Sequence, residues 1–85
     1  MRKKKVHSRD FIKFSEALSS EIRRRRIEKG YTLEECEERS KGRVKWRHLQ
    51  KIETYSSKNI EIDTLFNICK VLKVQPYELF ADISI

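Results

Sequence analysis

The sequence predicts an all-α domain, on the strength of three observations. Only two glycines and one proline interrupt the 85 residues, so long stretches are free of helix breakers. Apolar residues recur at the three- and four-residue spacing of amphipathic helices. Capping residues stand where these periodic segments begin and end. A chain this short forms one domain, and we expect a flexible basic arm at 1–10, the folded part at 11–82 and a tail at 83–85.

The first two helices are predicted from their capping residues. Ser8 is a candidate N-cap for a long first helix, which ends at Gly30. The part of this segment before Leu18 could instead form a separate short helix. Thr32 begins the second helix, and Glu35 three residues later completes a capping box.

Three further helices complete the predicted five-helix bundle. The third is expected at about 44–54, after a turn near Gly42, and a polar loop at 55–60 follows it. The fourth carries an apolar stripe that we expect to face the core, formed by Ile62, Leu65, Phe66, Cys69 and Leu72. Pro76 suits the first position of a short fifth helix that reaches residue 82.

The third helix has an apolar and a basic side. Helical geometry places Leu49 and Ile52 on the inner side, together with Lys45, whereas Arg47 and Lys51 lie on the outer side. The preceding helix is acidic. The net charge of +7 favours a polyanionic partner, most often nucleic acid, with an anionic membrane surface as the alternative.

Several classes of function are disfavoured. No apolar run approaches the ~20 residues that a membrane-spanning helix needs. Cys36 and Cys69 lie far apart and form no metal-binding pattern, so we expect them to be core residues of a protein in a reducing cytoplasm. We expect no enzyme, because no catalytic constellation stands out, and no cofactor, metal or small-molecule ligand.

Three segments together resemble the Cro/repressor type of helix-turn-helix, the XRE family. They are LSSEIRRRRIEKGYT at 18–32, HLQKIE at 48–53 and DTLFNICKVLKVQPYELF at 63–80. The resemblance implies a five-helix bundle of the lambda-repressor-like DNA-binding type, here with an N-terminal extension. Its helix-turn-helix would span about 32–54, with the third helix in the major groove. It also implies an ion pair between Arg26 and Glu53.

The sequence departs from the family pattern at several positions. The turn before the third helix is about two residues longer than usual. Glu37 stands where the family has a small alanine, Leu33 where it has a phosphate-contacting glutamine, and Tyr55 where it has a glycine.

The predicted DNA contacts centre on Arg47, whose guanidinium can form two hydrogen bonds with guanine. Lys51 would reach a base or a phosphate, and Arg43 and Lys45 are phosphate contacts at the helix start. Trp46 would either pack between helices or lie against sugar and thymine methyl groups. The remaining predicted contacts, to phosphate, are Ser56, Ser57 and Lys58. The alternatives are a solvated basic face and an ordinary polar loop.

The functional hypothesis is a sequence-specific transcriptional regulator that binds double-stranded DNA as a homodimer. We expect it to be encoded by a bacterium or a phage and to act in the cytoplasm, in association with the nucleoid. The predicted dimer interface contains Tyr77, Phe80, Ile83 and Ile85, although this segment could instead cover the domain's own core. The alternatives are a protein-interaction module on the same bundle and a non-specific nucleic-acid binder. The arm would contact DNA or serve as a solubilising tail.

Overall fold

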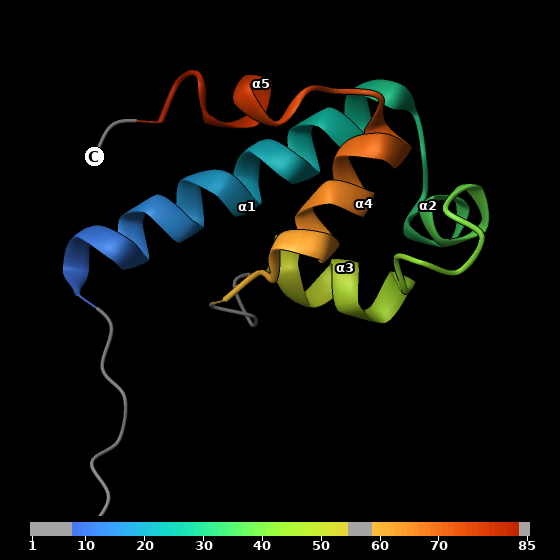
Figure 1. The fold of residues 1–85 in the computed structure, drawn as a ribbon, viewed down its shortest axis with the longest axis horizontal. Helices are drawn as coiled ribbons and strands as arrows, with labels where there is room; N and C mark the ends of the chain where they lie inside the picture. Colours follow the sequence, from blue (N-terminus) through green and yellow to red (C-terminus); the bar gives the residue numbers. More distant parts are fainter. Residues whose placement is uncertain (1–7, 55–58, 84–85) are drawn as a thin grey trace, which may run out of the picture.

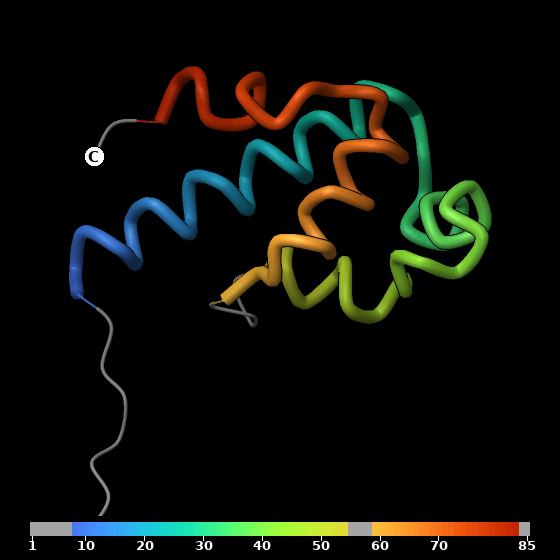
Figure 2. Tube along the Cα trace, in the orientation of Figure 1, coloured from blue at the N-terminus to red at the C-terminus, as the bar shows by residue number. Residues whose placement is uncertain are grey.

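The computed structural model describes residues 8–54 and 59–83. Within these residues the chain forms five helices and no strand, which confirms the all-α prediction. Figures 1 and 2 show α1 as a long diagonal helix, with α5 along one side of it and α4 crossing between α1 and α3. The helices are α1 (Arg9–Lys29), α2 (Leu33–Arg39), α3 (Trp46–Glu53), α4 (Ile62–Leu72) and α5 (Pro76–Phe80).

The long helix α1 is continuous, so the alternative of a separate helix before Leu18 is wrong. The Ser8 hydroxyl accepts a hydrogen bond from the Phe11 amide at 3.1 Å, as predicted for the N-cap. No glycine or proline interrupts the 21 residues that follow. Gly30 ends the helix with φ of 76°, a left-handed conformation that glycine adopts without strain. Because α1 begins at Arg9, the last two residues of the predicted arm are helical.

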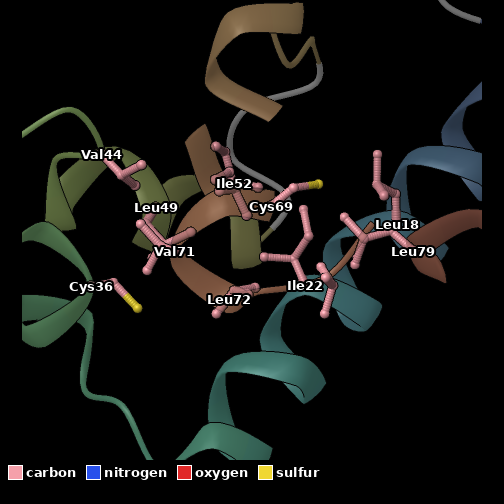
Figure 3. Close-up of a cluster of buried hydrophobic side chains, with 12 residues drawn as sticks. Leu18, Ile22, Cys36, Val44, Leu49, Ile52, Cys69, Val71, Leu72 and Leu79 are labelled. Atoms are coloured by element: carbon pink, nitrogen blue, oxygen red, sulfur yellow. The ribbon is translucent and has the colours of Figure 1, made fainter. Parts of the chain in front are cut away.

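The core lies where α1, α3 and α4 meet, and α2 and α5 close it on either side (Figure 3). Ile22 of α1 and Ile52 of α3 are completely buried. Both cysteines are buried as predicted, and removal from water raises the pKa of each thiol. The remaining buried apolar residues are Leu18, Val44, Leu49, Ile68, Val71, Leu72, Val74 and Leu79.

The predicted inner stripe of α4 is wrong at two positions. Ile62 is 85% exposed and Phe66 is 57% exposed. The core instead receives Ile68, together with the predicted Cys69 and Leu72. Helix α4 has apolar residues on more than one face, so spacing alone fits two stripes, and packing against α1 and α2 selects one of them.

Two helices are shorter than predicted. Helix α3 begins at Trp46, and the preceding Val44 is buried in the connection rather than in the helix. Lys45 is the N-cap, with extended backbone (φ −74°, ψ 135°), rather than a residue within the helix. Lys45 is exposed, so the prediction that it shares the inner side of α3 is wrong. Helix α5 ends at Phe80, two residues before the predicted end. None of the described helices is both long enough and apolar enough to cross a membrane.

Candidate nucleic-acid interface

The connection between α2 and α3 is a hydrogen-bonded turn. The Lys41 amide donates to the Glu38 carbonyl at 3.0 Å, and the Gly42 amide donates to the Glu37 carbonyl at 2.9 Å. This pair of bonds is the Schellman arrangement of a helix C-terminus. Lys41 and Gly42 both have positive φ, 56° and 80°, at the predicted position of the turn. The Ser40 hydroxyl then accepts from the buried Val44 amide at 2.9 Å, which fixes the approach to α3.

Glu37 caps the N-terminus of α3. Its Oε1 accepts a hydrogen bond from the Trp46 backbone amide at 2.8 Å. Its Oε2 lies 3.9 Å from Nζ of Lys45, whose own side chain forms no cap hydrogen bond. The first amides of a helix lack partners within the helix and carry partial positive charge, so a carboxylate satisfies one of them. The residue that departs from the family pattern therefore has a structural role in this chain.

An ion pair holds the other end of α3 to α1. Nε and Nη2 of Arg26 donate to the two carboxylate oxygens of Glu53 at 2.7 and 2.9 Å. The side chains are 13% and 3% exposed, and Nη1 of Arg26 also donates to the Tyr31 carbonyl at 2.8 Å. The hydrogen bonds to Glu53 raise the pKa of Arg26 above its ordinary value. The pair that the family resemblance implied is thus present in a bidentate geometry.

The outer side of α3 is basic and accessible. Arg47 and Lys51 are exposed, opposite the buried Leu49 and Ile52. Neither cation forms an ion pair within 4 Å with a described residue. The Arg47 guanidinium lies 5.0 Å from the centre of the Trp46 ring. This contact orients an arginine while leaving its N–H donors free to bind an acceptor.

The other predicted contacts divide into described and undescribed residues. Arg43 and Lys45 are exposed in the segment that leads into α3. Trp46 is half-buried, with part of its ring surface accessible, so both packing and surface contact are compatible with its position. The predicted contacts in the following loop, Ser56, Ser57 and Lys58, lie outside the described residues.

The predicted dimer residues do not form one open patch. Tyr77 is 72% exposed. Phe80 and Ile83 are partly buried against the core, and the Phe80 ring stacks on that of Phe14 with centroids 5.8 Å apart. Ile85 lies outside the described residues. The C-terminal segment therefore covers part of its own core and presents Tyr77 to solvent.

The sequence reasoning missed a second basic surface beside the first. A cleft between the end of α2 and α4 is lined by Arg39, Lys41, Arg43 and Lys70, with the exposed Phe66 at its side. The sequence does show a run of basic residues on both sides of Ser40, but only tertiary packing brings this run beside α4.

Among the described residues, no group of three or more histidine, cysteine, aspartate or glutamate side chains is placed to hold a metal ion. No protein-family model, curated protein or solved structure matches this chain.

Proposed function

We propose that the protein is a sequence-specific DNA-binding transcriptional regulator in which α3 enters the major groove. In this proposal α2 and α3 form a helix-turn-helix, and the bundle is of the lambda-repressor-like type. The observation that carries the proposal is the outer side of α3, where Arg47 and Lys51 are exposed without ion-pair partners among the described residues.

Support comes from the way α3 is held. Glu37 caps its first turn, the Arg26–Glu53 pair anchors its last residue, and Leu49 and Ile52 pack its inner side into the core. A reading helix must keep its side chains in register with base edges, so rigid attachment at both ends favours recognition. A helix that served only as a solvated surface would not need two such attachments.

The side chains of the exposed face divide by chemistry. Arg47 has the planar donor pair that can bind O6 and N7 of guanine. Lys51 lies one turn further along the same face and carries a point charge for a base or a phosphate. Arg43 and Lys45 precede the helix and would contact phosphates on the groove edge. Binding should weaken steeply with salt, because each phosphate contact releases a condensed counterion.

We further propose that the protein binds its operator as a homodimer. Tyr77 is exposed on α5, and a largely apolar groove of about 220 Å³ lies between the N-terminal half of α1 and Phe80, the last residue of α5. The groove is lined by Phe11, Phe14, Leu18, Leu65 and Phe80. A two-fold dimer would present two α3 helices to half-sites about 34–36 Å apart, which raises affinity beyond that of one short helix.

The decisive experiment compares Arg47 variants on a selected and a random duplex. A site would first be obtained by selection from a randomised duplex library with the intact chain. Arg47→Ala should weaken binding to that site by about 1–3 kcal/mol and weaken random-duplex binding much less. The matched Arg47→Lys variant keeps the charge but loses the bidentate geometry, so it should lose specificity while retaining random-duplex affinity.

The alternatives make different predictions in the same experiment. Equal losses of affinity for the selected and the random duplex would show that Arg47 contacts a phosphate rather than a base. Failure to select any sequence, with salt-dependent binding retained, would favour a non-specific nucleic-acid binder. No DNA binding at low salt would favour the protein-interaction module.

Sedimentation of the protein at tens of micromolar tests the dimer separately, and Tyr77→Asp should shift the equilibrium toward monomer. A monomer that also fails to assemble on DNA would refute the proposed dimer without refuting DNA binding.

A further inference from the structure

The cleft between the end of α2 and α4 combines positive charge with an exposed aromatic ring. It encloses about 500 Å³ and is open to solvent. Its polar and aromatic lining consists of Arg39, Ser40, Lys41, Arg43, Phe66, Asn67 and Lys70. No acidic residue is among the described residues that line it. The volume falls within the range of about 300–1,000 Å³ that is usual for small-molecule sites.

The cations of the cleft are not neutralised within the described chain. Lys41, Arg43 and Lys70 form no ion pair within 4 Å with a described residue. On α1, by contrast, Arg24 and Arg25 both pair with Glu21. Converging like charges repel one another, so an anion bound among them would relieve a repulsion that the fold leaves uncompensated.

Two contacts position the cleft's side chains. The Arg39 guanidinium lies 4.2 Å from the centre of the Tyr31 ring, a cation–π contact that orients the arginine without an ion pair. The Lys70 ammonium lies 5.6 Å from the centre of the Phe66 ring. A cation is therefore held beside an aromatic surface that remains 57% exposed. An anionic group and a planar ring could bind there at the same time.

We propose that this cleft binds a nucleoside phosphate, with the phosphates among Lys41, Arg43 and Lys70 and the base against Phe66. Arginine and lysine side chains bind phosphate oxygens, and aromatic side chains stack with any base because every base has a π-face. Asn67 supplies an amide that can both donate and accept hydrogen bonds at the edge of a base or sugar. The site shares Arg43, which precedes α3, with the proposed DNA contacts. It is otherwise separate from the outer face of α3 and does not depend on the proposed DNA recognition.

Calorimetric titration with ADP, adenosine and pyrophosphate tests the proposal on the full chain. ADP should bind at least ten-fold more tightly than either adenosine, which lacks the phosphates, or pyrophosphate, which lacks the base. Amide NMR shifts should locate the ADP effect at Lys41, Gly42 and Asn67. Equal affinity for pyrophosphate and ADP would overturn the nucleoside part, and no ADP binding at millimolar concentration would overturn the site.

Substitutions in the cleft assign the two halves of the ligand. Phe66→Ala should weaken ADP binding at least five-fold and leave pyrophosphate binding unchanged, whereas Phe66→Tyr should retain ADP binding. Lys41→Gln and Lys70→Gln should weaken both ligands. These side chains are exposed, so the variants should fold, which circular dichroism would verify.

Matched controls separate this site from other basic and aromatic surfaces. Tyr77→Ala removes another exposed ring, and Lys13→Gln removes another exposed charge, on α1. Both should leave ADP affinity unchanged. Lys51→Gln on α3 should also leave it unchanged, so loss of DNA binding and loss of nucleotide binding can be distinguished. Equal weakening by cleft and control variants would overturn the proposed location.

Discussion

The cap that Glu37 provides to α3 should contribute measurably to stability. Its carboxylate accepts a hydrogen bond from the Trp46 amide at 2.8 Å, and its side chain is 31% exposed. Hydrogen bonds to charged groups contribute about 1.5–3 kcal/mol, and N-caps contribute about 0.5–2 kcal/mol. The pairing with Lys45 adds little, because its 3.9 Å separation and the 69% exposure of the lysine leave it screened by water. We therefore expect Glu37→Ala to lower the free energy of unfolding by about 1–2 kcal/mol.

The neighbouring Glu38 offers a matched control. It occupies the same last turn of α2, is exposed, and its side chain forms no ion pair with a described residue. Replacement of either glutamate by alanine raises helix propensity and removes a negative charge from the unfavourable C-terminal end of the helix dipole. The difference between Glu37→Ala and Glu38→Ala therefore isolates the cap. Glu37→Gln keeps an acceptor without the charge, so its effect should lie between those of the two alanine variants.

Urea unfolding followed by circular dichroism at 222 nm would measure these differences. A loss of 1 kcal/mol corresponds to about 4–8 °C in melting temperature for a domain of this size, so thermal unfolding provides a second measurement. Equal stability of Glu37→Ala and Glu38→Ala, within about 0.5 kcal/mol, would refute the reasoning. That result would mean that water satisfies the α3 terminus as well as the carboxylate does.

Three further predictions concern the rest of the bundle. A double-mutant cycle with Arg26→Gln and Glu53→Ala should give an interaction energy above about 0.5 kcal/mol, and simple additivity would show that the pair is not coupled. Cys36 and Cys69, buried and with raised thiol pKa values, should react with a thiol reagent slowly at neutral pH and rapidly in urea; fast reaction of the native chain would contradict their burial. Lys73 ends α4 in the left-handed conformation with φ of 56°, which is strained for a residue other than glycine. Lys73→Gly should therefore raise the free energy of unfolding by about 0.5–1 kcal/mol. A variant that unfolds at lower urea concentration than the original chain would contradict this explanation.

The helical class and several helix ends could be predicted from local sequence. Ser8, Thr32 and Glu35 form the predicted caps, and Gly30 ends α1 at the predicted residue. These features depend on side chains within three or four positions of the backbone groups that they satisfy, so the sequence alone specifies them. The inner side of α3 was also predictable, because its only well-spaced apolar residues lie on one face.

The face of α4 that enters the core was decided by tertiary structure. Its apolar residues fit two helical stripes, and contact with the neighbouring helices buries Ile68 while leaving Phe66 in solvent. The spacing of apolar residues along a helix shows which faces are apolar. It does not show which of two apolar faces packs against a neighbouring helix. The early end of α5 likewise follows no local breaker in the sequence.

The proposed sites show the same division. The basic residues of α3 could be identified from the sequence, because helical geometry places Arg47 and Lys51 opposite the apolar side. The Glu37 cap and the cleft beside Phe66 could not, since each joins residues from different elements: Glu37 lies nine positions before Trp46, and Lys41 lies far along the chain from Lys70. Local sequence determined which faces are basic or apolar, whereas packing of the helices decided which of these residues meet, because such meetings depend on distances in space rather than along the chain.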